Sequence, residues 1–385
     1  MIIPSEFDSI RSYTAAEMPG VMARLLKDPE FSEVIDSRCG SLIRRFLFRK
    51  ASRMKNAEEF QKKIILPLAR ILLVLRSKGL TGNFNELDPE YGEGLLFISN
   101  HRDIVLDSVF LDYFLLKDYR FSAEIAIGDN LMIKPWIEDF VRLNHGFLVR
   151  RSITSPEEML KASTTLSRYI RFNINHDKPV WLAQREGRAK DSNDLTQRSV
   201  LKMLSISGDG DVISSLAGLH IVPLAISYEY DPCDWLKAME FQLKRDDPGY
   251  RKTRLNDLLN MRTGIFGYKG HIHYQAAGCI DSLLDGIDRN QPRNFQLEEA
   301  ARLIDNGIHR NYRIFPCNRI ASDVLNGTRD FSEGYSEREK KSFMRYLDRQ
   351  LSKIRIKNPD YEFLRTKMLE MYANPLMNKI KALEQ

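Results

Sequence analysis

The stretch GLLFISNHRDIVLDS, residues 94–108, predicts a buried strand that passes through a short polar turn into a buried helix. The apolar run at 94–99 has the length of a strand, and a second apolar run opens at Ile104 and continues over several helical turns. Functional groups commonly lie where a strand passes into a helix in an α/β sheet. Asn100 and His101 lie in this turn and are therefore candidate site residues.

Five further short β-rich runs follow along the chain, at residues 121–128, 146–151, 179–184, 220–228 and 270–280. Helical stretches separate most of these runs. The clearest helix opens with Ser155, Pro156 and Glu158, a capping box with proline at the first helical position. Strands that alternate with helices predict an α/β fold with a mixed, largely parallel sheet flanked by helices.

The helical pattern at both ends divides the chain into three predicted parts. Residues 1–80 form a helical, basic and amphipathic N-terminal region, and residues 81–290 form the α/β domain. Residues 291–385 form a helical C-terminal region with a second capping box at Ser336 and Glu339. A chain of 385 residues is long for one compact core, which agrees with helical additions or a second domain.

Composition and charge restrict the class of protein. The net charge of +6 favours anionic partners such as lipid head groups or phosphorylated substrates. The four cysteines lie far apart and form no Cys-x-x-Cys pair, so we expect reduced thiols in an intracellular protein and no zinc site. The N-terminus lacks the layout of a signal peptide, and the apolar run at 64–75 is short and interrupted by Arg70. We therefore expect a soluble or peripheral protein.

Residues 42–78 carry eleven Lys and Arg against two acids, with apolar residues at helical spacings among them. A basic amphipathic helix of this kind can lie on an anionic membrane surface. The alternative is a solvated helix whose apolar side packs on the domain behind it. The sequence leaves both interpretations open.

Asp107 is the most informative residue of the opening stretch, because apolar neighbours surround it on a helix that should be buried. A buried carboxylate without a partner costs several kcal/mol, and His101 is the nearest candidate partner in sequence. An aspartate that holds an imidazole in one tautomer makes it a general base for a hydroxyl proton. The alternative is that Asp103 caps the helix, Asp107 finds a structural donor and His101 is an ordinary loop histidine.

Two apolar runs carry weaker signals. Strand periodicity places Arg150 and Arg151, at the end of 146–151, on opposite sides, so one of them can face a pocket and bind a phosphate. The alternative is a pair of solvated arginines. Pro223, inside an apolar strand, marks an edge or an irregularity and can shape the wall of a pocket.

The segment QREGRAKD, residues 184–191, follows a third predicted strand. It offers the carboxylate of Glu186, a glycine at Gly187 that allows close backbone approach, and two cations, Arg188 and Lys190. Glycine and cations after a strand suit an anion site. Taken alone, the segment is no more specific than a polar loop.

Taken in order, these four segments resemble the sequence blocks of the glycerolipid acyltransferase family, which includes bacterial glycerol-3-phosphate acyltransferases and lysophosphatidate acyltransferases. The family's blocks read Asn-His-x4-Asp, Gly-x-Phe-Phe-Ile-x-Arg, Glu-Gly-x-Arg and Val-Pro-Val/Ile. This chain is similar to them at 100–107, 145–151, 186–188 and 222–224, and the resemblance covers roughly residues 80–285.

The resemblance implies an O-acyltransferase of phospholipid biosynthesis that needs no cofactor and no metal. It would move a fatty acyl group from acyl-carrier protein or coenzyme A to the hydroxyl of glycerol 3-phosphate or a lysophospholipid. By position, His101 is implied as the general base and Asp107 as its partner. The implied phosphate binders are Arg150 or Arg151 with Arg188 and Lys190, and the implied acceptor-site residues are Glu186, Gly187 and Pro223.

The same resemblance, with the basic N-terminal region, implies a cytoplasmic enzyme that is peripheral on the inner face of the cell membrane. Its expected partners are the acyl-ACP or acyl-CoA donor, an anionic lipid acceptor and the membrane surface. Nucleic acid is not expected as a partner, because the basic stretch lacks aromatics at the spacing of a recognisable module.

The chain departs from the family pattern at three places. Five residues rather than four separate His101 from Asp107, so that Asp103 could be the partner instead. His145 stands at the customary glycine of the second block, and the third block lacks the usual small residue before Arg188. These departures leave two alternatives open: a non-phosphate acceptor such as an acylated amino-acid lipid, and a non-catalytic lipid-binding relative.

Overall fold

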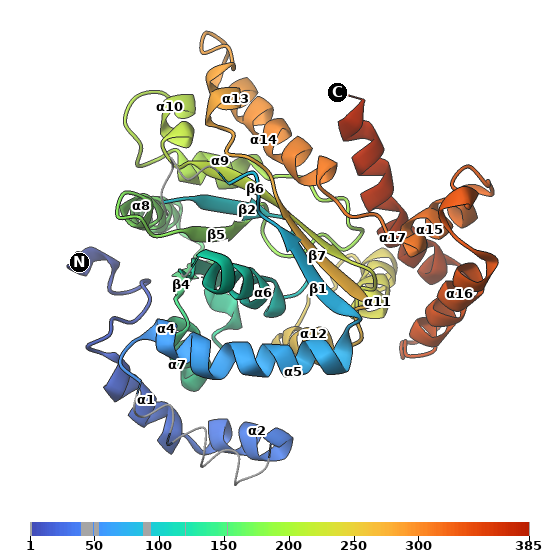
Figure 1. Cartoon of the computed structure of the whole chain (residues 1–385), viewed down its shortest axis with the longest axis horizontal. Helices are drawn as coiled ribbons and strands as arrows, with labels where there is room; N and C mark the ends of the chain where they lie inside the picture. Colours follow the sequence, from blue (N-terminus) through green and yellow to red (C-terminus); the bar gives the residue numbers. More distant parts are fainter. Residues whose placement is uncertain are drawn as a thin grey trace.

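The computed structural model describes residues 2–39, 49, 54–87, 94–119, 121–151 and 153–384. Within these residues the chain forms one seven-stranded sheet, which lies at the centre of the molecule (Figure 1). Its strands are β1 (Gly79–Asn83), β2 (Leu96–Ser99), β3 (Glu124–Gly128), β4 (Gly146–Val149), β5 (Val180–Ala183), β6 (Ile221–Tyr228) and β7 (His271–Ala276).

The sheet is mixed and largely parallel, which confirms the predicted fold class. The strand order is β1–β7–β6–β2–β5–β3–β4, and among the described strands only β6 and β7 pair antiparallel. In the central strand β2, Leu96 lies opposite Val180 of β5 on one side and opposite Ile221 of β6 on the other. The carboxyl ends of β2 to β6 therefore meet at one edge, where ligand sites form in sheets of this kind.

Helices cover both faces of the sheet (Figure 1). On one face, α5 (Leu66–Arg76) and α6 (Leu106–Phe114) pack against apolar side chains such as Phe97 and Trp181. On the other face, α8 (Pro156–Ile174), α9 (Arg198–Leu204), α10 (Val212–Ala217), α13 (Asp281–Asp285) and α14 (Arg293–Arg310) bury a second core. Burial on both faces explains why the parallel strands read as continuous apolar runs in the sequence.

Additional helices extend the molecule at both ends. Near the N-terminus, a separate apolar cluster joins helices α1 (Met18–Lys27), α4 (Ala57–Phe60) and α7 (Pro135–Leu143), with α2 (Pro29–Cys39) following α1. Near the C-terminus, another cluster joins α11 (Asp234–Asp246), α15 (Pro316–Asn326), α16 (Glu337–Leu351) and α17 (Tyr361–Leu383). The helix α12 (Arg254–Phe266) lies beside α5 (Figure 1). The division of the chain at residues 80 and 290 remains a prediction.

The strand β1 lies partly within the region that the sequence predicts to be helical. Its sequence, GLTGN, contains two glycines and no alternation of apolar and polar residues, so no strand pattern is visible there. The tertiary contact explains the strand. Residues 79–83 pair with β7, and the Phe114 ring packs so closely on Gly82 that a Cβ there would lie 2.6 Å from Cζ.

The predicted helix starts are present. Ser155 accepts a hydrogen bond from the Glu158 N–H at the start of α8, and Ser336 and Glu339 form a reciprocal capping box at the start of α16. Within the residues that the structure describes, no helix combines the length and the apolar character needed to cross a bilayer.

Gly307 gives a test of how α14 packs on the sheet. A Cβ at this position would lie 2.7 Å from both Cβ and Cγ of Pro223 on β6, and a proline ring cannot move aside easily. We expect Gly307→Ala to lower the midpoint of thermal unfolding, because overpacking typically costs about 1–3 kcal/mol and outweighs a helix-propensity gain of about 1 kcal/mol. Gly20→Ala on α1, where nothing lies within 4 Å of the added Cβ, is the matched control and should raise the midpoint slightly. A stabilised Gly307→Ala protein would contradict the close packing.

Candidate active site

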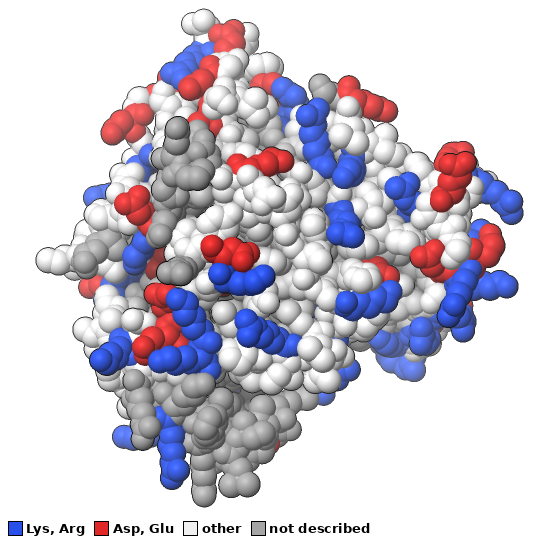
Figure 2. All heavy atoms as spheres, in the orientation of Figure 1, with Lys and Arg blue, Asp and Glu red and all other residues white. Residues whose placement is uncertain are grey.

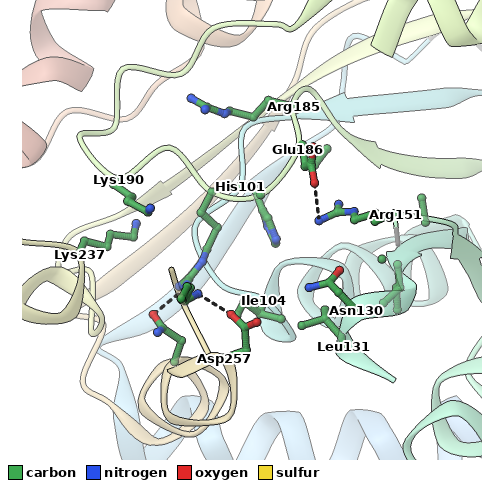
Figure 3. Close-up of a pocket in the computed structure, with 18 of the residues that line it drawn as sticks. His101, Ile104, Asn130, Leu131, Arg151, Arg185, Glu186, Lys190, Lys237 and Asp257 are labelled. Atoms are coloured by element: carbon green, nitrogen blue, oxygen red, sulfur yellow. Dashed lines mark hydrogen bonds and ion pairs between the residues drawn. The ribbon is translucent and has the colours of Figure 1, made fainter. Parts of the chain in front are cut away.

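The turns after β2, β4 and β5 converge at the carboxyl edge of the sheet and line a cleft of about 570 Å³. His101 follows β2, Arg151 follows β4, and Arg188 lies in the loop after β5. In Figure 3 the His101 ring points into this cleft, with Arg151 on one side and Lys190 and Lys237 on the other. The structure thus brings three of the four predicted segments into one site.

His101 is held by a buried carboxylate. Its Nδ1 lies 2.9 Å from Oδ2 of Asp107, so the contact predicted between these side chains is present. Asp107 is fully buried and also accepts hydrogen bonds from the N–H groups of Arg102 and Asp103 and from the Tyr228 hydroxyl. When Nδ1–H donates a hydrogen bond to this carboxylate, the lone pair of Nε2 is available to a reactant in the cleft.

The additional residue between His101 and Asp107 lies in the loop before α6. Asp103 caps that helix, since its Oδ1 accepts from the N–H groups of Val105 at 2.9 Å and Leu106 at 2.8 Å. The partner of His101 is therefore Asp107, and Asp103 has a structural task. Burial raises the pKa of Asp103, whose Oδ2 has no hydrogen-bond partner among the described residues.

The side chains of Asn100, in the turn itself, and of Trp181, on β5, hold the turn that carries His101. Asn100 is fully buried and joins β2 to β6, since its side-chain amide donates to the carbonyl of Ile226 at 2.9 Å and accepts from its N–H at 2.8 Å. Trp181 on β5 donates from Nε1 to Ser99 Oγ at 3.0 Å, and its ring meets the His101 ring edge-on. Asn100 thus positions the histidine and does not itself line the cleft.

Two of the predicted phosphate binders bring guanidinium groups to the cleft. Arg151 Nη1 lies 3.9 Å from Oε1 of Glu186. Arg188 donates from Nη2 to Asn260 Oδ1 at 2.8 Å, while its Nη1 is buried with no partner among the described residues. Buried guanidinium N–H groups without a protein partner suit an anionic ligand. The role of both arginines remains a prediction.

Five further Lys and Arg residues line the same cleft, namely Arg185, Lys190, Lys237, Lys244 and Lys252. Lys190, which the sequence selects, is ion-paired with Glu240, and burial lowers its pKa to about 8. The other four cations were not predicted from the sequence. Lys237 is buried on α11, and its Nζ lies 2.5 Å from Oδ2 of Asp231. Arg185 has an Nε without a hydrogen-bond partner in the described part of the chain. Arg185 lies inside the third block and could have been selected by its place after β5. Lys237 lies outside all four blocks, and no sequence pattern marks it.

Arg150 and Pro223 do not line this cleft. The Arg150 guanidinium turns towards the N-terminal segment, where Nη2 donates to the carbonyl of Ser9 at 3.2 Å and Nη1 lies 3.9 Å from Asp129 Oδ2. Pro223 lies inside β6 beneath α14. Successive side chains of a strand point to opposite sides, so Arg150 points away from the cleft because Arg151 faces it.

Two residues that belong to the four sequence blocks adopt a left-handed backbone. Gly187, with φ of 67°, lines the cleft beside the exposed Glu186. His145, with φ of 59°, directly precedes β4 at the opposite, amino edge of the sheet and occupies the glycine position of the family's second block. Oε1 of the buried Glu124 lies 3.1 Å from His145 Nδ1, which anchors a non-glycine residue in this strained conformation. The departure from the family pattern therefore has a local compensation.

A second pocket, of about 100 Å³ and mostly apolar, adjoins the cleft. Ile104, Ser108, Ile125, Ile127 and Leu131 line both spaces. Leu66 of α5 and Met261 of α12 help to enclose the second pocket. Asp112 lies one turn of α6 beyond Ser108, and burial raises its pKa to about 7. An apolar space that opens beside His101 can hold an aliphatic chain.

Comparison with known families supports one class of chemistry. Residues 79–227 match the family model described as Acyltransferase. We call this matched segment the acyltransferase region. The match confirms the resemblance to glycerolipid acyltransferases and supports a general acyltransferase role. The acyltransferase region contains the His101–Asp107 pair, Arg151 and Arg188, but it spans less than half of the chain. The chain has no match among curated proteins.

Proposed function

We propose that the protein transfers a fatty acyl group from an acyl thioester to a hydroxyl of glycerol 3-phosphate or a lysophospholipid. The observation that carries this proposal is the His101–Asp107 pair beside a cationic cleft, within the acyltransferase region. His101 Nε2 removes the hydroxyl proton while the oxygen bonds to the thioester carbonyl carbon. The C–S bond then breaks, and the leaving thiolate takes the proton from His101, so that the base is regenerated.

The charge around the cleft supports an anionic acceptor. Arg151, Arg185 and Arg188 line it, and the last two have buried guanidinium nitrogens without partners among the described residues. A phosphate bound by these groups would orient the acceptor hydroxyl towards His101, so that binding energy lowers the cost of bringing the reactants together. A carboxylate on an acylated amino-acid lipid would satisfy the same cations and is the second candidate acceptor.

The adjoining apolar pocket supports a fatty acyl donor. Ile104, which lies three residues after His101, lines both the cleft and the pocket. The acyl chain would occupy the pocket and leave the thioester carbonyl beside the histidine. The thiol carrier, acyl-carrier protein or coenzyme A, would remain at the mouth of the cleft.

A lipid-extract assay tests the reaction class directly. The purified protein is incubated with total lipid extract, glycerol 3-phosphate and a labelled acyl-ACP or acyl-CoA, and products are identified by mass. A labelled phospholipid or acylglycerol phosphate supports the proposal, and a labelled amino-acid lipid assigns the second acceptor. Transfer to no lipid would assign the non-catalytic alternative.

Replacement of His101 gives the first prediction for this function. His101→Ala should lower kcat/KM by about 10²- to 10⁴-fold, since it removes the proton acceptor. The midpoint of thermal unfolding should change little, because Asp107 keeps three other hydrogen-bond donors. His176→Asn, at an exposed histidine near the end of α8, is the matched control and should retain activity. Full activity of His101→Ala would overturn the assignment of the base.

The neighbouring arginines give a second, internally controlled prediction. Arg151→Ala and Arg188→Ala should each raise the KM for the acceptor by about 10- to 100-fold, since a hydrogen bond to a charged group is worth about 1.5–3 kcal/mol. Arg150→Ala should not, because its guanidinium lies outside the cleft. Steady-state kinetics with each substrate varied in turn separate the two effects. A rise in the donor KM instead would assign these cations to a phosphate of the donor.

We also propose that the protein binds an anionic membrane surface through α5 and α12. The surface that these helices share exposes six aliphatic side chains, which are Ile71, Val74, Leu75, Leu255, Leu258 and Leu259. The exposed charged residues of α5, of α12 and of residues 251–253 before α12 are basic, namely Arg70, Arg76, Arg251, Lys252, Arg254 and Arg262. In Figure 2 the surface over the middle of α5 is mostly uncharged, with Lys and Arg side chains among it.

The position of this surface supports the proposal. Both helices also enclose the apolar pocket, through Leu66 and Met261, so a lipid leaving the bilayer would have a short path to the acyl site. Of the residues 42–78 that predict membrane attachment, 54–78 and Arg49 are described. Arg44, Arg45 and Lys50, also expected to contribute, lie outside the described residues.

Sedimentation with lipid vesicles tests the membrane surface. The double variant Val74→Asp/Leu255→Asp should bind vesicles containing phosphatidylglycerol much more weakly than the wild type, because it places acids on side chains that are 81% and 76% exposed. Binding should also fall between 0.1 M and 1 M salt, where the Debye length shortens from about 10 Å to about 3 Å.

Leu160→Asp, at an exposed leucine of α8 on the opposite face of the sheet, is the control and should bind like the wild type. Equal binding of the double variant and the wild type would show that α5 and α12 do not form the membrane surface.

A further inference from the structure

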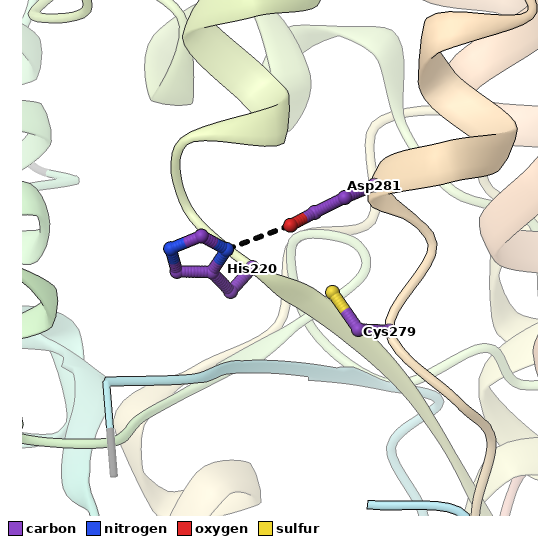
Figure 4. Close-up of side chains that lie close together, drawn as sticks. All are labelled: His220, Cys279 and Asp281. Carbon is purple, nitrogen blue, oxygen red and sulfur yellow. Dashed lines mark hydrogen bonds and ion pairs between the residues drawn. The ribbon is translucent and has the colours of Figure 1, made fainter. Parts of the chain in front are cut away.

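A second cluster of reactive side chains lies at the amino edge of the sheet. His220 directly precedes β6, while Cys279 and Asp281 lie where the chain leads from β7 into α13 (Figure 4). One nitrogen, one sulfur and one carboxylate oxygen of these residues all lie within 4.8 Å of one another. The catalytic cleft is at the opposite edge, so the proposed acyl transfer leaves this cluster without a task.

The fold holds the three residues in place. His220 Nδ1 lies 2.7 Å from Asp281 Oδ2, and the other carboxylate oxygen, Oδ1, is buried without a hydrogen-bond partner among the described residues. His220 has a left-handed backbone with φ of 48°, which a residue other than glycine adopts at a conformational cost. The N–H of Ile280 donates to the carbonyl of Ile221 at 3.0 Å and ties the Cys279–Asp281 segment to β6.

We propose that His220, Cys279 and Asp281 bind one Zn²⁺ ion. An imidazole nitrogen, a thiolate and a carboxylate are ligands that zinc accepts together, and three protein ligands leave a fourth position for water. Oδ1 of Asp281 has no hydrogen-bond partner among the described residues, so these residues do not fully satisfy the carboxylate. The His220 side chain is 36% exposed and Cys279 is half-buried, so an ion can reach the donors from solvent.

The same residue types could instead form a nucleophilic cysteine site, but the geometry argues against it. A cysteine nucleophile needs the aspartate on one ring nitrogen of the histidine and the sulfur on the other. In Figure 4 the Nδ1 of His220 faces Asp281, and the second ring nitrogen points away from the Cys279 sulfur. The sulfur therefore does not meet the second ring nitrogen, whereas one donor atom from each of the three residues lies within 4.8 Å of the other two, as a shared metal ion requires.

The ion would act on structure and not on acyl transfer. From His220 to Tyr228, the length of β6 at 3.3 Å per residue is about 26 Å, so the ion lies far from the His101–Asp107 pair. It would fasten the start of β6 to the segment after β7, which lie far apart in the sequence. The absence of a Cys-x-x-Cys pair predicts no zinc site from the sequence, because that pattern detects only ligands that are close along the chain.

Metal titration of the full chain tests the site. Protein stripped with a chelator is titrated with Zn²⁺ by calorimetry and with Co²⁺ by absorption spectroscopy. We expect one ion per chain, a thiolate-to-cobalt charge-transfer band in the near ultraviolet, and a thermal unfolding midpoint that rises with Zn²⁺. Cys279→Ser should abolish the band, and His220→Asn should weaken Zn²⁺ binding at least about 10-fold; asparagine tolerates the left-handed backbone at this position.

His176→Asn is the control and should bind both ions like the wild type. A band that persists in Cys279→Ser would place the thiolate elsewhere and overturn the site, as would a wild type without a band. If His220→Asn does not fold, Asp281→Asn replaces it, and unchanged Zn²⁺ binding in that variant would overturn the site. Cys279→Ser should retain acyl transfer, so the two proposals fail independently.

Discussion

The complete satisfaction of one buried carboxylate, Asp107, is the constraint on which the rest of the site depends. An ionised carboxylate inside a protein is tolerated only when hydrogen bonds replace its hydration. Asp107 receives them from His101, from two backbone N–H groups of the turn after β2 and from Tyr228 at the end of β6. Tyr274 of β7 also donates to the Asp107 carbonyl. The orientation of the imidazole is therefore a consequence of folding, since its ring completes a network that three strands and one helix build.

The cleft combines a family region with parts that lie outside it. Residues 79–227 supply the histidine, its aspartate and the arginines after β4 and β5. The opposite wall comes from α11 and α12, which carry Lys237 and Asn260, and the N-terminal helices close the apolar pocket. The cleft is thus built jointly by the acyltransferase region and by helices that lie outside it. Departures from the family blocks are tolerated where a new contact compensates, as the Glu124–His145 contact does for the lost glycine.

Much of the fold could be predicted because its signals are local. Five strands that are buried on both faces read as apolar runs, and the polar turn after β2 shows where the site lies. The part that could not be predicted depends on contacts between distant segments. β1 has no pattern of its own and exists because β7 offers a partner. Periodicity showed that Arg150 and Arg151 diverge, but only the surrounding elements decide which of them faces the cleft. No sequence pattern marks Lys237 as a residue of the cleft.

The direction of the strands explains why the cleft and the His220 cluster lie at opposite edges of the sheet. The parallel strands have their carboxyl ends at one edge of the sheet and their amino ends at the other. At both edges, backbone N–H and C=O groups beyond the last hydrogen bond between strands need partners from loops and side chains. At the carboxyl edge, those loops carry His101, Arg151 and Arg188 and leave an open cleft. At the amino edge, β6 is joined to the segment after β7, because the antiparallel β6–β7 pair returns the chain to the start of β6. The reversal of one strand pair thus brings His220 to Cys279 and Asp281, while the parallel strands gather the cleft residues at the other edge.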